Sequence, residues 1–407
     1  LTSAFVYKVG RSLKFFKSDV VVATDTRISK DLLATSLISG CLSNGINVYY
    51  ATVSSTPALI YYSLMKKIVG VMITASHNKY SDNGIKIINK GYKLNSDEEN
   101  EIEYLIDNDS YSFDLGKLDF ININYDYLKF INTYLINSKL KIIIDCANGS
   151  TSNLAFNVFS KVTNDLIIIN NNPNGYNINE NCGSTDVLKL KEEIIKNKYD
   201  IGFAYDGDGD RVVAVDKYGN VCSGDILIYL LALYLKKQYK MNKIVLSKMS
   251  NLGIIKALNK NNIDVIETDV GDKYIMESLQ NNNLILGGED SGHIIINNVF
   301  HTGDGILISL FILRALKYLK INLSDIYNSL NLYYSNNINI KVKDKNVILN
   351  NINLDKKVKE IKSKLNNDCK IIIRPSGTED FIRVCIMGKN KEEVDKYLDE
   401  IIKIIKD

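Results

Sequence analysis

Short apolar runs alternate with longer amphipathic stretches along most of the chain. The apolar runs are rich in β-branched residues, as at residues 20–22, 201–204 and 371–373, a pattern that indicates buried strands. Between them, apolar positions recur at helical spacing in residues 30–42, 187–196, 226–237, 305–319 and 391–405. Ser29 precedes the first of these helices and is predicted to cap it. Strands that alternate with helices of this length are typical of α/β layers.

One arrangement occurs four times along the sequence. A β-branched run leads into a polar loop rich in Gly, Asp, Ser or Arg, and a second apolar run follows; the loops lie at residues 74–84, 206–211, 287–293 and 374–379. We therefore predict three similar α/β domains with mixed sheets and a C-terminal α+β domain, arranged around a central cleft. The expected domains span residues 1–124, 125–223, 224–333 and 334–407, with one loop in each.

Composition and charge narrow the class of protein. The chain has 407 residues, of which 45% are hydrophobic and 24% charged, as in soluble globular proteins. Its 50 basic and 47 acidic residues are intermixed, so nothing favours a nucleic-acid partner. The longest apolar runs are shorter than the roughly 20 residues that span a bilayer, so we expect no membrane contact. Six scattered Cys without a C-x-x-C pair, and a start unlike a secretory signal, favour the cytoplasm.

The scarce residue types gather at the loops. The chain has only six Arg, three His and three Pro. Four of the six Arg lie in or beside the loops or in the segment at residues 25–27: Arg27, Arg211, Arg374 and Arg383. Because the planar guanidinium of Arg binds phosphate oxygens in a bidentate way that Lys cannot, this placement indicates a chemical task.

The second loop indicates a metal site. Asp206, Asp208 and Asp210 alternate with glycines after a buried strand, so their oxygens can converge on one hard cation such as Mg²⁺. A solvated acidic turn is the plainer alternative, but three close carboxylates repel one another unless a cation offsets them. An EF-hand loop needs Glu at its twelfth position, which is Lys217 here.

The other three loops offer a nucleophile, a sugar site and an anion site. Ser76 beside His77, with Lys86 nearby, is a candidate nucleophile or phosphoryl carrier, although a Ser in a turn often has no such role. Glu, Ser and His side chains in the third loop suit several sugar hydroxyls, and a polar hairpin is the alternative. The fourth loop, with its Arg side chains and a Ser-Gly-Thr turn, suits a phosphate group, unless it is only a surface turn that begins at Pro375.

Taken in order, the four loops resemble those of the α-D-phosphohexomutase superfamily, and the resemblance runs from Val20 to Val384. Four further segments look more like the phosphoglucosamine mutase branch than the phosphomannomutase/phosphoglucomutase branch: residues 145–149, 173–179, 182–186 and 302–306. The resemblance implies an isomerase that moves a phosphoryl group between O6 and O1 of glucosamine phosphate through a sugar 1,6-bisphosphate. Its product would feed the synthesis of UDP-N-acetylglucosamine and cell-wall precursors.

The resemblance also implies a role for each candidate residue. Ser76 would carry the phosphoryl group and would hold Mg²⁺ together with Asp206, Asp208 and Asp210. Lys86 would shuttle the proton of the sugar hydroxyl, with Arg27, His77 and Arg211 shaping the charge around the transfer. The sugar would be bound by Glu289, Ser291, His293 and Lys273. The phosphate that does not react would be held by Arg374, Ser376, Gly377, Thr378 and Arg383.

Some features depart from the family pattern. Lys79 and Asp380 stand where the family usually has Pro. Family members begin with a strand and a Gly-Thr-Asp-Gly-Ile-Arg-Gly-like loop that this sequence does not contain, so we expect either a fragment or a first domain without that loop. The expected partner is a small phosphosugar, and the chain is expected to be a monomer or homodimer. A phosphomannomutase/phosphoglucomutase, a non-catalytic phosphosugar-binding protein and a metal-dependent phosphatase stay open as alternatives.

Overall fold

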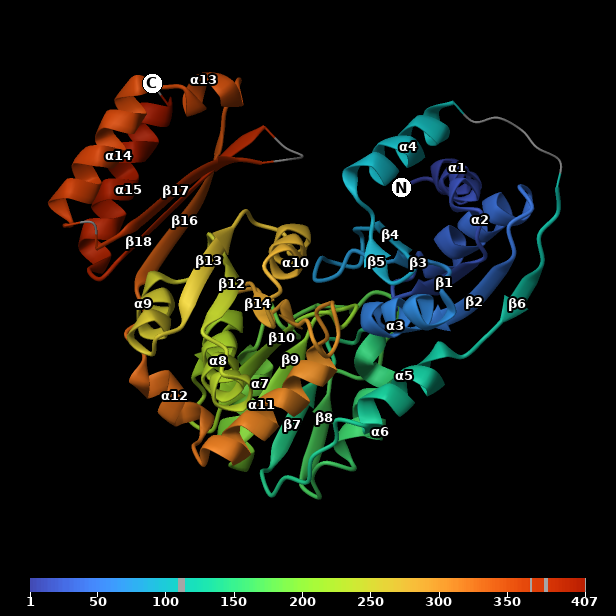
Figure 1. The fold of residues 1–407 in the computed structure, drawn as a ribbon, viewed down its shortest axis with the longest axis horizontal. Coiled ribbons are helices and arrows are strands. Elements are labelled where there is room, and N and C mark those ends of the chain that lie inside the picture. The colour runs from blue at the N-terminus through green and yellow to red at the C-terminus, as the bar shows by residue number, and fades with distance from the viewer. Residues whose placement is uncertain (109–113, 367, 377–379, 407) are drawn as a thin grey trace.

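The chain folds around four β-sheets with helices packed on them. A computed structural model describes residues 1–108, 114–366, 368–376 and 380–406, and the sheets are counted over these residues. The first and fourth sheets stand on opposite sides of the molecule, with helix α10 (Asp272–Asn281) between them (Figure 1). The predicted architecture, three α/β units with mixed sheets followed by an α+β unit, is confirmed.

The first sheet has the strand order β5-β4-β3-β1-β2-β6. Its centre is parallel, and β4 joins β3 in antiparallel pairing. The strands are β1 (Val20–Thr24), β2 (Val48–Val53), β3 (Val69–Ile73), β4 (Ile85–Asn89), β5 (Tyr92–Lys93) and β6 (Leu118–Phe120). The helices are α1 (Ser3–Ser12), η1 (Leu13–Phe16), α2 (Lys30–Leu42), α3 (Thr56–Lys66) and α4 (Ser96–Asp107).

Helix α2 spans the predicted residues, but the predicted cap at Ser29 is wrong. Ser29 has a helical backbone conformation, with φ −74° and ψ −9°, and its side chain makes no capping hydrogen bond. Its hydroxyl instead donates to the amide oxygen of Asn83. An extended conformation is what lets a capping side chain reach the first free N–H groups of a helix, so Ser29 joins two loops instead.

The second sheet has the order β11-β10-β9-β7-β8, in which β9 and β10 form an antiparallel pair. Its strands are β7 (Ile142–Asp145), β8 (Leu166–Ile169), β9 (Ile201–Tyr205), β10 (Val212–Asp216) and β11 (Val221–Cys222). Its helices are α5 (Ile123–Asn132), η2 (Ser150–Asn153), α6 (Ala155–Phe159) and α7 (Leu188–Asn197). Helix α7 lies within one residue of its predicted bounds at each end.

The third and fourth sheets follow in chain order. The third has the order β13-β12-β14-β15 and the fourth the antiparallel order β16-β18-β17. The strands are β12 (Lys243–Ser247), β13 (Asp264–Thr268), β14 (Leu286–Gly288), β15 (Ile294–Ile296), β16 (Tyr334–Lys341), β17 (Lys370–Pro375) and β18 (Phe381–Gly388). The remaining helices are α8 (Gly224–Tyr239), α9 (Leu252–Lys260), α11 (Gly305–Leu319), α12 (Leu323–Ser329), α13 (Lys345–Leu349), α14 (Ile352–Lys364) and α15 (Lys391–Lys406).

The buried apolar side chains show how these units are joined. One large cluster runs through the first three units and includes most of α8 and α11. The fourth unit has a separate core around Val384, Ile386 and Leu398. It is tied to the third unit at Tyr333, whose backbone exchanges two hydrogen bonds with the Asn251 side chain. The last unit therefore has its own core and also packs on the third unit through a small cluster that joins Cys385 and Met387 to Met249 and Leu252.

A buried acid sits where α5 meets α11. Asp304 caps α11, accepting from Leu307 N at 3.0 Å, and both of its oxygens accept from the Tyr127 hydroxyl. Burial raises the pKa of Asp304 from 3.8 to about 7. The folded chain thus keeps this proton at a pH where the unfolded chain has lost it.

We expect this acid to make the fold less stable as the pH rises from about 4 to about 7, by up to about 4 kcal/mol. An Asp304→Asn variant keeps the acceptor for Leu307 and Tyr127 but has nothing to titrate. Urea unfolding at several pH values should therefore show the wild type losing stability relative to the variant across this window. Parallel pH profiles for the two proteins would contradict the assignment.

In the part of the chain that the structure describes, no helix has the length and apolar character needed to cross a membrane.

Candidate active site

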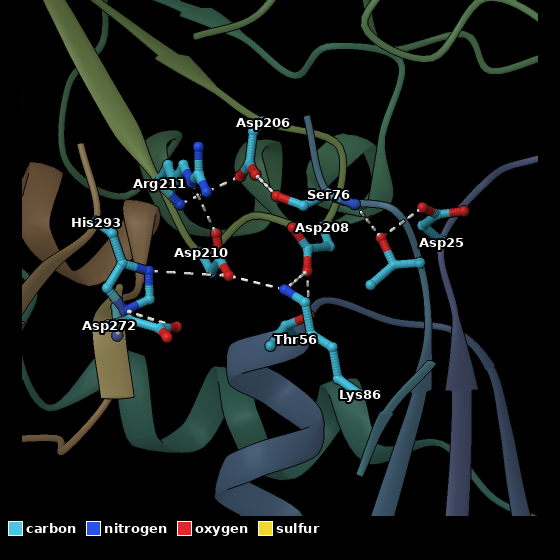
Figure 2. A network of polar contacts seen from close by, with 12 residues as sticks. Asp25, Thr56, Ser76, Lys86, Asp206, Asp208, Asp210, Arg211, Asp272 and His293 are labelled. Carbon is cyan, nitrogen blue, oxygen red and sulfur yellow. Dashed lines mark hydrogen bonds and ion pairs between the residues drawn. The ribbon is translucent and has the colours of Figure 1, made fainter. Parts of the chain in front are cut away.

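The loop after β3 contacts the loop after β9. Ser76, on the first loop, donates a hydrogen bond from Oγ to Asp206 Oδ2 on the second at 2.6 Å (Figure 2). The two residues are 130 positions apart in sequence. The first two sheets are therefore placed so that a hydroxyl and a carboxylate cluster face each other.

The backbone around Ser76 is held in an uncommon conformation. Ser76 has φ +51°, in the left-handed region, which costs free energy for a residue other than Gly and is sustained only by surrounding contacts. Its N–H donates to Thr74 Oγ1 at 2.8 Å, and its carbonyl accepts from Arg27 and from Asn179. These bonds fix the direction in which the Ser76 hydroxyl points.

Arg27 is hydrogen-bonded to the backbone of the Ser76 loop. Its side chain is buried and pairs through Nε with Asp25 Oδ2 at 2.9 Å. The rest of the guanidinium donates to the backbone carbonyls of Ser76, Asn78 and Lys79. Burial raises the pKa of Asp25, and the charge of Arg27 opposes that rise. Arg27 therefore orients the serine loop through its backbone.

Three buried carboxylates form a group that could bind a metal ion. One oxygen each from Asp206, Asp208 and Asp210 lies within 4.8 Å of the others. Asp208 Oδ1 and Asp210 Oδ1 are buried without a hydrogen-bond partner among the described residues. Unpartnered buried oxygens are costly, and hard cations bind such oxygens. Burial and the charges of Asp210 and Asp208 raise the pKa of Asp206 well above its usual value, so a nearby cation would favour the ionised form of this carboxyl group.

Lys86 partly offsets this negative charge. Its Nζ lies 2.6 Å from Asp208 Oδ2 and 2.9 Å from Asp210 Oδ2. Burial disfavours its charge, but these two carboxylates outweigh burial and raise the pKa of Lys86. Burial likewise opposes ionisation of Asp210, yet Lys86 and His293 hold its pKa well below the usual range. Lys86 thus carries a firmly held proton beside the Asp cluster.

We expect a Lys86→Met variant to be less stable than the wild type when no divalent cation is present, by on the order of 2–3 kcal/mol. Removing the ammonium takes away the cation that contacts both Asp208 and Asp210, and the effect is moderated because the Lys86 side chain is 29% exposed. Millimolar Mg²⁺ should raise the melting temperature of the variant more than that of the wild type. An equal rise in both would argue against a shared role of Lys86 and a cation.

His77 and Arg211 lie beside the cluster. Burial, followed by the nearby charge of Arg211, lowers the pKa of His77, so its ring is neutral near pH 7. Its Nδ1 is buried without a partner among the described residues. Arg211 Nε lies 3.7 Å from Asp210 Oδ1, and the Arg211 backbone N–H donates to Asp206 Oδ1.

His293 connects the third loop to the Asp cluster. Its ring is buried, with Nδ1 3.8 Å from Asp210 Oδ2 and Nε2 3.8 Å from Asp272 Oδ2. Gly303 N lies 3.2 Å from Nε2 of the same ring. Figure 2 shows the ring between the two carboxylates. The predicted sugar-binding histidine is therefore in contact with a predicted metal-binding residue.

The other predicted sugar-binding residues are placed less uniformly. Glu289 accepts from Gly271 N at 3.0 Å and so adjoins the N-terminus of α10. Ser291 is exposed. Lys273 turns toward the first unit, where its Nζ donates to Glu99 at 2.9 Å and to Ser96. Of these three, Lys273 already has a carboxylate partner outside the loops.

The fourth loop lies on the last sheet. Arg374 and Arg383 are directly opposite each other on β17 and β18. Burial and the charge of Arg383 lower the pKa of Arg374, partly offset by Glu289 of the third loop. Ser376 Oγ and Arg383 Nε are buried and have no partner among the described residues. These donors suit an anion, whereas the predicted Gly377 and Thr378 lie outside the described residues.

Thr56 and Asp272 also lie at the site, and neither was among the sequence candidates. Thr56, at the start of α3, donates its hydroxyl to Asp208 Oδ2 and its N–H to the Asp208 carbonyl. Asp272, the first residue of α10, faces His293. Thr56 directly follows Ser54-Ser55 and precedes Pro57, which is a helix-start signal and carries no chemical one.

Comparisons with known proteins agree in pointing to one family. Models of the four domains of phosphoglucomutase/phosphomannomutase match in order: α/β/α domain I at residues 1–112, domain II at 125–219, domain III at 223–333 and the C-terminal domain at 338–404. A phosphoglucosamine mutase of Caldicellulosiruptor saccharolyticus is 38% identical, with all of this chain and 95% of the relative covered.

Solved structures show the same fold. A phosphoglucomutase/phosphomannomutase family protein of Burkholderia thailandensis aligns with a TM-score of 0.85 at 19% identity, covering 100% of this chain and 94% of that one. An N-acetylphosphoglucosamine mutase of Aspergillus fumigatus, solved with GlcNAc-6P and magnesium, aligns with a TM-score of 0.68 at 17% identity over 86% and 92% of the two chains.

Proposed function

Since the chain belongs to the phosphoglucomutase/phosphomannomutase family, we propose that it is a phosphoglucosamine mutase, which interconverts glucosamine 6-phosphate and glucosamine 1-phosphate. The observation that carries this proposal is the placement of Ser76 Oγ 2.6 Å from Asp206, one of three buried carboxylates. A hydroxyl fixed beside a cation site is the arrangement that phosphoryl transfer needs. The 38% identical relative supports the choice of an amino sugar as substrate.

In the proposed reaction, the phosphoryl group of phosphorylated Ser76 moves to O1 of glucosamine 6-phosphate. The bond between phosphorus and Ser76 Oγ breaks as the bond to O1 forms, and O1 loses its proton. The resulting 1,6-bisphosphate turns over in the cleft and returns its O6 phosphoryl group to Ser76, leaving glucosamine 1-phosphate. Lys86 is proposed to relay this proton to the departing Ser76 oxygen, and its contacts with Asp208 and Asp210, next to the Asp206 that bonds to Ser76, support this role.

The chain's own residues would divide the remaining tasks. Asp206, Asp208 and Asp210 would hold Mg²⁺ together with the Ser76 oxygen, and the unpartnered oxygens of Asp208 and Asp210 fit this role. A bound Mg²⁺ would supply neutralisation of the charge that develops on the moving phosphoryl group. Arg27 would keep the serine loop in place, with His77 and Arg211 adjusting charge around it.

The substrate is proposed to lie between the third and fourth loops. Glu289, Ser291 and His293 would bind the sugar, whereas the contact of Lys273 with Glu99 makes its role the weakest of the four. Arg374, Ser376 and Arg383 would hold the distal phosphate together with the predicted Gly377 and Thr378. Two buried donors without partners support this. Domain bounds at 1–124, 125–223, 224–333 and 334–407, and action in the cytoplasm, stay predictions.

A coupled assay tests the function directly. With glucosamine 1,6-bisphosphate as primer and Mg²⁺ present, the protein should convert glucosamine 6-phosphate to glucosamine 1-phosphate. Its kcat/KM for this substrate should exceed those for glucose 6-phosphate and mannose 6-phosphate. No product would sink the proposal, and a preference for glucose or mannose 6-phosphate would place the chain in the phosphomannomutase/phosphoglucomutase branch.

A further inference from the structure

We propose that Asp272 recognises the ammonium group at C2 of the sugar and so sets the preference for glucosamine phosphate over glucose phosphate. This inference rests on the proposed function and names a residue that selects its substrate. Asp272 begins α10, the helix that lies between the first and fourth sheets (Figure 1). It also lines a cavity of about 340 Å³ together with Lys86, Asp210 and His293. A carboxylate is thus placed in the same cavity as the proposed transfer chemistry.

One oxygen of Asp272 is open to a ligand. Its contacts with Lys93 and with His293 all involve Oδ2. Oδ1 has no hydrogen bond within the part of the chain that the structure describes, and the side chain is 26% exposed. Figure 2 shows Asp272 beside the His293 ring and on the same side of the site as Asp210. A ligand in the cavity can therefore approach Oδ1 without displacing a contact of Oδ2.

The surroundings keep this carboxylate charged and suited to an ammonium. Burial disfavours the charge, but His293 and Lys93 outweigh it and lower the pKa of Asp272 to about 2. Lys93 already places a primary ammonium against Oδ2, which shows that the carboxylate accepts this group in its present position. A protonated sugar amine offers the same group, whereas a hydroxyl at C2 offers no charge and forms a weaker bond.

Most of the neighbouring carboxylates have a partner, whereas Glu103, which also lines the cavity, is exposed. Asp206 accepts from Ser76, while Asp208 and Asp210 pair with Lys86. Glu289 accepts from the backbone of Gly271. Glu99, which lines the same cavity, is paired with Lys273. Asp272 lies against the His293 ring, which also contacts Asp210, so it brings a carboxylate with an unpaired Oδ1 close to the Asp cluster.

The test compares an Asp272→Asn variant of the full chain with the wild type. Values of kcat/KM are measured for glucosamine 6-phosphate and for glucose 6-phosphate under the same priming conditions. We expect the ratio of the two to fall about tenfold or more in the variant, because a neutral amide loses the charge-assisted bond to the ammonium. Asparagine keeps the size and an oxygen acceptor, so the change isolates the charge.

Two control variants separate selectivity from structure. Glu277→Gln removes one charge from an exposed position on the same helix, and its ratio should match the wild type. Lys93→Met removes the ion pair between Lys93 and Asp272 but leaves Asp272 intact, so it should keep the preference for the amino sugar. If Asp272→Asn and Lys93→Met lower kcat/KM equally for both sugars, Asp272 only joins the two units and the inference is overturned.

The remaining outcomes distinguish this inference from the function on which it rests. A wild type that prefers glucosamine 6-phosphate, with a variant that keeps the same ratio, would overturn the role of Asp272 alone. A wild type that turns over glucose 6-phosphate as efficiently as glucosamine 6-phosphate would overturn the proposed function and the inference together.

Discussion

A Ser76→Ala variant is expected to lose mutase activity by about a thousandfold or more. The reaction is proposed to pass through a phosphoryl group on Ser76 Oγ, and among the described residues this is the hydroxyl that bonds to the Asp cluster at Asp206. Alanine leaves no atom to carry the group. The variant should also stay free of label when wild type and variant are incubated with bisphosphate carrying ³²P, and intact mass should show no added phosphate.

A matched control lies five residues away in the same loop. Ser81 is exposed and its hydroxyl has no contact with the Asp cluster, so Ser81→Ala should keep both activity and labelling. The Ser76→Ala protein should unfold at nearly the wild-type temperature, since the hydroxyl makes a single side-chain hydrogen bond. Label on Ser76→Ala at the wild-type level would refute the assignment of Ser76 as the phosphoryl carrier. Loss of label on Ser81→Ala would indicate Ser81 as the carrier instead.

Loss of the metal site should have the second largest effect. Treatment with EDTA is expected to abolish activity, and added Mg²⁺ should restore it. An Asp206→Asn variant should lose at least about a hundredfold in kcat even at saturating Mg²⁺, because it removes one of three converging carboxylates and the acceptor of the Ser76 hydroxyl. Isothermal titration with MgCl₂ measures the binding that the kinetics depend on.

Stability gives this prediction an independent check. Burial, together with the charges of Asp208 and Asp210, raises the pKa of Asp206, so a neutral amide avoids the cost of a charge at this position. Without metal, Asp206→Asn should melt no lower than the wild type, which is the opposite of the expectation for Lys86→Met. The surface variant Glu192→Gln on α7 should change neither property. An EDTA-treated protein with full activity would exclude the metal role.

The helices were predicted well from the sequence where apolar residues recur at helical spacing. Helices α2 and α11 have the predicted bounds, and α7 and α15 differ from theirs by a single residue at one end or both. These segments are governed by local apolar spacing, which is visible in one stretch of sequence. The cap at Ser29 was not predictable in the same way, because its hydroxyl bonds to Asn83, 54 residues away.

The candidate site was predictable as a set of loops and less so as a set of contacts. Glycines and paired carboxylates identify the Asp loop from the sequence, but nothing local shows that Lys86 lies between Asp208 and Asp210, more than 120 positions away. Nor does the sequence show the partner of Lys273. Its neighbours suggested a residue facing the cleft, while its partner Glu99 belongs to another unit. The sequence gives no functional signal for Asp272, because a carboxylate at a helix start usually only interacts favourably with the helix dipole.

The backbone of Ser76 also bears on which amino acids could take over its task. Threonine carries the same hydroxyl and would serve many phosphoryl-accepting sites equally well. Here, however, φ is +51°, a region that a β-branched side chain strongly disfavours. The loop geometry thus favours an unbranched alcohol as the phosphate carrier, so main-chain conformation bears on the identity of this residue as well as chemical reactivity.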